Sequence, residues 1–324
     1  MSRLKLLILI VILIFAVISL LYFNRVQYKT RTFKGELLFN AAEYNHRRED
    51  TIVKSLDEKE KDKASMIEVK QIHTGDLKIP LSNALNIEYP TCIGLEDKAV
   101  EVPIFAYLVH HEKYGNFLID TGCDASFVNN LYGSVKGILV PKFVPKTTLK
   151  SENAIEEQLA EVKQSIKGVF FTHLHPDHTA GLKGLPDNLI YVAGMGEESV
   201  SYKFLLEIDH FKRDDIINLL DFNSEKAFIH PIGTTIDIFG DKSLLAISTP
   251  GHTKGHVSYL VNTEKNPILI AGDACILNKS LETGAGPGTS SADTKLAQET
   301  FDKINDFIKK NPWVKVWPGH DFPK

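Results

Sequence analysis

The chain has 324 residues, of which 43% are hydrophobic and 24% charged, so it is long enough to bury the core of one large domain. Its 37 basic and 41 acidic residues give a formal net charge of -4, which argues against nucleic-acid binding because that needs a concentrated positive face. The three cysteines, Cys92, Cys123 and Cys275, predict no disulfide framework, since the set is odd and sparse.

The N-terminal segment, residues 1–23, is predicted to anchor the protein in a membrane. Residues 4–23 are dominated by Leu, Ile, Val and Phe, with Lys5 as the only charge, and their length matches the hydrocarbon core of a bilayer. A cleaved signal peptide is the alternative, but its apolar part would be shorter, and no Ala-x-Ala-like site precedes Asn24. We therefore expect a single-pass protein of the cell membrane.

The side of the membrane is less strongly indicated. Basic residues flank the apolar segment on both sides, so the positive-inside rule is balanced or favours a cytoplasmic domain. A short N-terminal tail before an apolar segment is also typical of an export signal. We expect the globular part on the extracytoplasmic face.

Residues 24–66 are polar and are predicted to form a linker or stalk. They contain mixed-charge runs at 44–50 and 57–63, which bury too little apolar surface to form a core. The globular domain then spans residues 67–324. It begins with an apolar–polar alternation at 67–72, which indicates a half-buried strand that ends at 73–75, where His73 is predicted to be structural.

The next strands are predicted at 103–109 and 116–119, as a hairpin-like pair, and at 166–171. A helix over 151–163 would be capped by Ser151, and residues 194–222 show a mostly helical pattern. A final helix reaches about residue 310 with Ser291 or Asp293 as its cap, and a last strand covers 314–317. Short strands between these helices are predicted at 227, 235–239, 243–248, 257–261 and 268–270.

The most informative stretch follows the strand at 166–171 and reads H-x-H-x-D-H, with His173, His175, Asp177 and His178. Side chains alternate along an extended chain, so His173 and His175 point the same way, and the other two turn toward a second position. Imidazoles and carboxylates this close together are costly to fold unless a cation holds them. We therefore expect one or two metal ions here.

Three further candidate ligands follow predicted strands downstream. His252 lies in Thr-Pro-Gly-His, Asp273 in Ala-Gly-Asp and His320 in Pro-Gly-His, each beside a glycine where the backbone can turn sharply. A single histidine is more often a surface or core residue than a ligand. The complete motif, with partners in this order, favours a metal site.

These motifs, with the Leu-Ile-Asp-Thr-Gly run at 118–122, resemble those of the metallo-β-lactamase-fold hydrolase superfamily from about residue 67 to the C-terminus. The resemblance implies an α/β fold, a four-layer αββα sandwich, with a dinuclear metal site. For the first metal it implies the ligands His173, His175 and His252. For the second it implies Asp177, His178 and His320, with Asp273 bridging the two ions.

The implied chemistry is hydrolysis. Neutral imidazoles and carboxylates suit zinc, so two zinc ions are expected, with manganese or iron as alternatives. Two adjacent cations lower the pKa of a shared water and hold it as hydroxide, while they polarise the scissile bond. Asp177 is expected to bind metal and to move the proton as the catalytic residue. Asp120 would accept a hydrogen bond that orients a ligand from outside the metal shell.

Several branches of this superfamily fit poorly. The best-known zinc β-lactamases carry Cys or Ser where this chain has Asp273, and flavodiiron enzymes carry Glu in place of His175. Glyoxalase II adds a glutathione-binding region after its last ligand, whereas only a few residues follow His320 here. The RNA-processing branch inserts a large domain before its last ligand, whereas only a short stretch separates Asp273 from His320 here. The nearest resemblance is to the N-acyl homoserine lactonase type.

A small-molecule substrate, most plausibly a lactone, is therefore expected, and a phosphodiesterase or glyoxalase II-like thioesterase of the same fold is the alternative. A mono-iron persulfide dioxygenase-like oxidoreductase would use one metal, and a non-catalytic metal-stabilised protein would have lost a ligand, so the complete set argues against both. The lactonase type places a tyrosine near its metals, for which Tyr191 and Tyr202 are candidates. The pocket is expected between 194–222 and 284–290, with His210 as a surface or packing residue.

Overall fold

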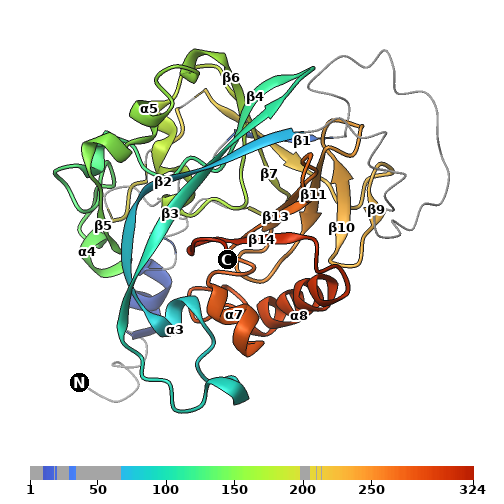
Figure 1. Cartoon of the computed structure of the whole chain (residues 1–324). Coiled ribbons are helices and arrows are strands. Elements are labelled where there is room, and N and C mark those ends of the chain that lie inside the picture. The colour runs from blue at the N-terminus through green and yellow to red at the C-terminus, as the bar shows by residue number, and fades with distance from the viewer. Residues whose placement is uncertain are drawn as a thin grey trace, which may run out of the picture.

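The computed structural model describes residues 10–17, 19, 29–33, 67–197, 205–208, 210–212 and 214–324. Its strands form two sheets (Figure 1). In spatial order, the larger sheet contains β1 (Lys29–Phe33), β8 (Ile216–Leu220), β7 (Ile190–Gly194), β6 (Ile166–Phe170), β4 (Gly115–Ile119), β3 (Ala99–His111), β2 (Ile67–Pro80) and β5 (Lys146–Thr148). The smaller sheet contains β14 (Lys315–Pro318), β13 (Ile268–Gly272), β12 (Val257–Val261), β11 (Leu244–Ser248), β10 (Thr234–Asp237) and β9 (Phe228–Ile229).

From residue 67 on, the described helices are short, except for the last one. They are α3 (Leu81–Ala84), α4 (Val140–Phe143), α5 (Ile155–Gln158), α6 (Pro176–Thr179), α7 (Asn278–Thr283) and α8 (Thr294–Lys310). Single 3-10 turns are η2 (Pro90–Cys92), η3 (Ala125–Phe127), η4 (Ser151–Asn153), η5 (Lys163–Ser165) and η6 (Ala180–Gly184). In Figure 1, α5 and α8 lie on opposite sides of the strands.

Three hydrophobic clusters hold these layers together. Between the sheets, Phe117 and Phe170 of the larger sheet pack in one cluster with Tyr259 of the smaller sheet. A second cluster joins the other face of the larger sheet to α5, and a third joins the smaller sheet to α8 through Ile304 and Phe307. Burial of these faces is the main stabilising term in the fold. The predicted αββα sandwich is therefore confirmed.

Strand directions bring the candidate site together at one edge of both sheets. β4, β6 and β7 run in parallel, so their C-terminal ends meet at the same edge of the larger sheet. In the smaller sheet, β13 and β14 are parallel, and β11 is antiparallel to β12, as β12 is to β13. The C-terminal ends of β11, β13 and β14 therefore also share an edge. Loops after these strands carry the candidate ligands, as expected for sites at strand ends.

Most strands predicted from the sequence are confirmed within one to three residues. The hairpin of β3 and β4 pairs Tyr107 with Ile119. The first strand differs, since β2 continues past residues 73–75 with a register shift between His73 and Asp76. Gly75 has φ +134, a conformation that glycine adopts freely, so this turn is a bulge inside the strand rather than its end.

The helix predicted over 151–163 is wrong in its length. The segment forms η4, α5 and η5, and Ser151 makes no capping bond. Glu156 accepts from the backbone N–H of Ala125 at 3.0 Å, and Gln158 donates to the carbonyl of His73 at 2.7 Å. These bonds tie the segment to η3 and to β2, so tertiary contacts outweigh its helix propensity.

The helical pattern predicted for 194–222 is wrong for the described residues of this segment, none of which is helical. Residues 216–220 form β8, which pairs in parallel with β7 through Tyr191 and Ile217. A short apolar run cannot be assigned to helix or strand by periodicity alone. Here the run forms a strand because it pairs with the open edge of β7. Residues 198–204, 209 and 213 lie outside the described residues, so Tyr202 has no assigned place.

The N-terminal predictions are described only in part. Residues 10–17 and 19 are helical, while 4–9, 18 and 20–23 of the predicted anchor lie outside the described residues. Within the described ranges, none of the helices has both the length and the apolar character needed to cross a bilayer.

Residues 29–33, inside the predicted linker, form β1 beside β8 and thus join the larger sheet. A sheet edge offers unpaired backbone groups, which this short Thr-containing run satisfies. For residues 34–66, outside the described part, the linker stays a prediction.

The start of α8 confirms Asp293 as its cap, since Asp293 Oδ1 accepts from the backbone N–H of Leu296 at 2.9 Å. We expect Asp293→Ala to lower the free energy of unfolding by about 1 kcal/mol, the usual loss for a helix N-cap. Asp306→Ala, on the exposed face of the same helix, is the control and should change stability by less than about 0.5 kcal/mol. Denaturant titration of both variants measures the difference, and equal stabilities would contradict the capping role.

Candidate metal centre

The motif after β6 folds as a sharp turn that separates its side chains into two groups. His173 lies three residues after the end of β6, and His175, in extended backbone, is the residue before α6, whose first position is Pro176. Proline is favoured at the first helical position because its missing N–H would be unpaired there. One turn of α6 then brings Asp177 and His178 to the second group, while the ring centroid of His178 stays 4.1 Å from that of His173.

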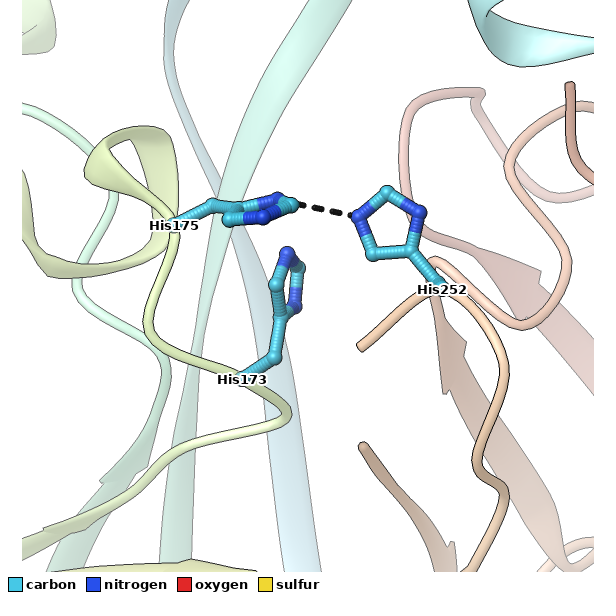
Figure 2. Close-up of side chains that lie close together, drawn as sticks. All are labelled: His173, His175 and His252. Atoms are coloured by element: carbon cyan, nitrogen blue, oxygen red, sulfur yellow. Dashed lines mark hydrogen bonds between the residues drawn. The ribbon is translucent and has the colours of Figure 1, made fainter. Parts of the chain in front are cut away.

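The first group consists of His173, His175 and His252, whose ligand atoms all lie within 4.8 Å of one another. Figure 2 shows the ring of His173 pointing into the space between the other two rings. His252 Nε2 and His175 Nδ1 are 3.0 Å apart. The first two residues follow the larger sheet and His252 follows β11, so both sheets contribute to this group.

The second group consists of Asp177, His178 and His320, again within 4.8 Å. His320 Nε2 is 3.2 Å from Asp177 Oδ2, and His178 Nε2 is 3.5 Å from the same oxygen. Asp273 faces both groups: its Oδ2 is 3.2 Å from His252 Nε2, and its Oδ1 is 3.5 Å from His178 Nε2 and from His320 Nε2. The seven residues predicted from the sequence are thus brought together, with Asp273 between the two groups.

Hydrogen bonds outside the cluster orient its imidazoles. Asp120 Oδ2 accepts from His178 Nδ1 at 2.8 Å, as predicted, and the carbonyl of Pro103 accepts from His320 Nδ1 at 2.8 Å. The hydroxyl of Thr172 donates to Asp120 at 2.8 Å and accepts from His173 Nδ1 at 3.1 Å. Each bond holds the proton on Nδ1 and leaves the Nε2 lone pair directed inward, which is the tautomer that binds a metal.

Burial keeps the first group neutral. It lowers the pKa of His173 and of His252 well below the usual value for histidine, and the neighbouring histidines lower both further. Burial also lowers the pKa of His175, although Asp177 and Asp273 oppose this effect. These imidazoles therefore carry free lone pairs at neutral pH, the form required of metal ligands.

Carboxylates dominate the second group. Burial alone would lower the pKa of His178, but Asp120, Asp177 and Asp273 outweigh it and raise the pKa to about 10. The pKa of His320 is also raised, since Asp273 and Asp177 outweigh its burial. Burial opposes ionisation of Asp177, yet the adjacent histidines lower the pKa of its carboxyl. The group thus favours positive charge at its centre.

The donor set fits a pair of cations. Three buried atoms that face the centre have no hydrogen-bond partner: His173 Nε2, His178 Nε2 and Asp273 Oδ1. A buried polar atom without a partner is costly, and these three residues also form a set whose ligand atoms all lie within 4.8 Å of one another, which links the two groups. Imidazole nitrogens with carboxylate oxygens are the ligands of zinc, and also of iron and manganese.

Three further buried residues lie around this centre, and sequence reasoning gave none of them a role there. His256 accepts from the backbone N–H of Asp273 at 3.0 Å, and Glu197 accepts from the backbone N–H of Leu174 at 3.0 Å. His210 was expected at the surface or in packing; it is buried, and its Nδ1 bonds the Thr179 hydroxyl at 2.7 Å. His256 stands four residues after His252 beside a glycine, which is a weak signal in the sequence, whereas Glu197 and His210 carry none.

The candidate tyrosine is not found in the described residues of the site. Tyr191 is buried in β7 and packs its ring against Phe171 and Phe211, on the helix-covered face of the larger sheet. Burial raises the pKa of its hydroxyl to about 12. Tyr202 lies outside the described part of the chain.

Asp120→Asn should weaken binding of one metal equivalent by about 10- to 100-fold, the usual loss when an outer partner of a ligand is removed. Both oxygens of Asp120 accept hydrogen bonds, from Thr172 and from His178. The amide nitrogen of the Asn variant is a donor, so it would face another donor and one of these bonds would be lost. Competition with a chelator measures the affinity. Asp124→Asn, in the carboxylate that caps η3, is the control, and equal affinities in the two variants would refute the role.

The chain is similar in sequence to curated N-acyl homoserine lactonases. An N-acyl homoserine lactonase from Bacillus sp is 25% identical over 231 residues, which cover 68% of this chain and 82% of that protein. The N-acyl homoserine lactonase AttM of Agrobacterium fabrum is 27% identical over 231 residues, with the same coverage of 68% and 82%.

A solved structure of an N-acyl homoserine lactone hydrolase, with the product N-hexanoyl-L-homoserine bound at its catalytic metal center, superposes with a TM-score of 0.59. It is 22% identical in sequence and covers 80% of this chain and 94% of its own, so it shows the same fold. The family model of the metallo-beta-lactamase superfamily matches residues 99–320, from the start of β3 to the last candidate ligand. Since this match takes in most of the folded domain and every residue of both ligand groups, the chain belongs to the metallo-beta-lactamase superfamily.

Proposed function

We propose that this protein is a dinuclear metal-dependent hydrolase that opens a lactone, with N-acyl homoserine lactones as the substrate class. The observation that carries the dinuclear site is Asp273, whose two carboxylate oxygens each face a separate group of ligands. A carboxylate placed in this way could hold two cations at once. Zinc is the metal we propose, because imidazole and carboxylate donors suit it best.

The position of each ligand indicates which cation it would hold. His173, His175 and His252 would hold one cation, Asp177, His178 and His320 the other, and Asp273 both. When bound, such a pair supplies an acidified water and polarises the carbonyl of the substrate. Asp177 and His175 are half-buried, while the other ligands are buried, so a substrate reaches the centre from their side. Asp177 is thus the carboxylate best placed to pass a proton to the leaving alkoxide.

The lactone assignment is supported by the relatives. Those reported above are named N-acyl homoserine lactonases, and one solved relative holds a ring-opened N-acyl homoserine at its metal center. A further relative, with a TM-score of 0.50 and 15% identity, is a dizinc quorum-quenching lactonase in complex with such a product. Phosphodiesters and thioesters remain the alternative substrates of the same centre.

The test is hydrolysis by the metal-loaded, full-length protein of three matched panels: N-acyl homoserine lactones, thioesters and phosphodiesters. We expect lactone opening to have the highest kcat/KM, and to disappear after metal removal and return on reconstitution. Cleavage of thioesters or phosphodiesters without lactone opening would refute the lactonase assignment and leave the hydrolase and its centre in place.

We also propose that residues 1–23 anchor the protein, with the domain on the extracytoplasmic face. Large apolar side chains within 10–17 are 43–71% exposed, which favours a nonaqueous environment. We expect full-length protein to stay in the membrane fraction after carbonate washing, whereas a chain that starts at Asn24 and keeps β1 should be released.

Ser55→Cys should react with an impermeant thiol reagent on intact cells, over a low background because the native cysteines are buried. Absence of labelling, with an external control labelled, would contradict the extracytoplasmic side.

A further inference from the structure

Glu197 connects the two loops that carry the first ligand group. Its Oε2 accepts from the backbone N–H of Leu174, between His173 and His175, at 3.0 Å. Its Oε1 accepts from the backbone N–H of Gly255 at 3.1 Å and from the hydroxyl of Thr253, both in the loop after His252. One carboxylate therefore joins a loop of the larger sheet to a loop of the smaller sheet.

The backbone around Glu197 fits closely against the His252 loop. A Cβ atom added to Gly194, at the end of β7, would lie 1.9 Å from the carbonyl oxygen of Gly255. A Cβ atom added to Gly255 would lie 2.6 Å from the backbone nitrogen of Glu197. Contact this close is available only to glycine, so the end of β7 is seated directly on the loop that positions His252.

The second ligand group is oriented by other residues. His178 bonds Asp120, and His320 bonds the carbonyl of Pro103. Glu197 bonds neither of them in the described structure; its hydrogen bonds go to Leu174, Thr253 and Gly255. Loss of the Glu197 bonds would therefore act on one group of ligands and spare the other.

We propose that Glu197 is a positioning residue that sets the distance between the His173–His175 loop and His252, and thereby the affinity of the first cation position. This inference rests on the dinuclear centre of the proposed function, and on no particular substrate. The two loops come from different sheets, so the 3.0 Å separation of His175 Nδ1 and His252 Nε2, both of which would bind the first cation, depends on how the loops are held together. A carboxylate that accepts on both sides keeps the loops at one spacing.

Glu197→Gln is the test variant, because it keeps the size of the side chain and replaces one acceptor by an NH2 donor. That donor must face the N–H of Leu174 or the N–H of Gly255, so one side of the connection is lost. Asp237→Asn is the matched control. Asp237 also accepts from backbone N–H groups at both oxygens, from Gly240 and Lys242 at 2.8 Å each, but in the turn before β11, at the opposite end of that strand from His252.

The measurement is equilibrium Zn²⁺ binding to the full-length chain by chelator competition, with thermal unfolding of the metal-free forms recorded in parallel. We expect Glu197→Gln to weaken one of two equivalents by about 10- to 100-fold and to leave the other unchanged, as for other outer partners of metal ligands. Asp237→Asn should keep both affinities even where it unfolds earlier. Thr253→Val, which removes one of the three bonds, should give a smaller loss at the same equivalent.

Other outcomes overturn the inference. If folded Glu197→Gln binds both zinc equivalents as tightly as wild type, the positioning role is refuted. An equal loss of affinity at both equivalents of Glu197→Gln would also refute it, and so would the same loss of affinity in Asp237→Asn. If Glu197→Gln does not fold, the Thr253→Val result decides in the same way. A wild-type chain that binds two equivalents but opens no lactone would refute only the proposed substrate, whereas one that binds no metal would overturn both proposals.

Discussion

Asp177→Asn is expected to lower kcat by about 10²- to 10⁴-fold, the range for loss of a positioned acid–base group. Asp177 Oδ2 lies 3.2 Å from His320 Nε2 and 3.5 Å from His178 Nε2, and the side chain is 19% exposed, so it borders both the cluster and the approaching substrate. An amide keeps the shape but neither carries the charge nor accepts a proton. The measurement is kcat for a lactone at saturating metal, with the metal content determined on the same sample.

Asp187→Asn provides the control for this variant. Asp187 is ten residues further along the chain, its side chain is 67% exposed, and it pairs with Lys212 at the surface. We expect it to keep the wild-type kcat and stability. An unchanged kcat in Asp177→Asn, with metal bound, would place the acid–base group elsewhere in the molecule.

Asp273→Ala should have the largest effect on metal content. Its two oxygens face the two ligand groups, so both cation positions lose a ligand, and the repulsion between adjacent cations is no longer balanced. We expect wild type to hold close to two equivalents after reconstitution, and the variant to hold one or fewer with activity reduced to background. Elemental analysis of desalted protein measures the content.

Asp306→Ala, on the exposed face of α8, is the control for metal content and should retain both equivalents. A wild-type value near one after reconstitution would favour the mono-iron alternative over the dinuclear hydrolase. Two equivalents retained by Asp273→Ala would show that this carboxylate does not bridge. Both results are independent of the substrate, so they test the centre alone.

The ligand set was predictable because its chemistry is local. The motif at His173–His178 and the later His252, Asp273 and His320 each follow a strand and a turn that a short stretch of sequence encodes. The cap of α8 is equally local, since Asp293 bonds an N–H three residues away. Patterns of this kind depend on side-chain periodicity and on glycine, and little on the rest of the chain.

The elements that were predicted incorrectly depend on distant partners. Residues 216–220 look helical alone, yet they become β8 because the edge of β7 is open to them. The segment 151–163 breaks into short turns because Glu156 and Gln158 bond η3 and β2, which are far away in the sequence. In both cases long-range hydrogen bonds outweigh a weak local preference, which amounts to less than about 1 kcal/mol per residue.

The sequence by itself determined which residues can bind metal, their order along the chain and the family to which they belong. Only the tertiary structure brought these side chains within reach of one another, because that depends on how the loops after β6, β11, β13 and β14 meet at one edge of two sheets. It also decided the role of Glu197, an ordinary acidic residue in the sequence, whose carboxylate is buried where those loops approach. Proximity across sheets comes from packing, and no local pattern encodes it.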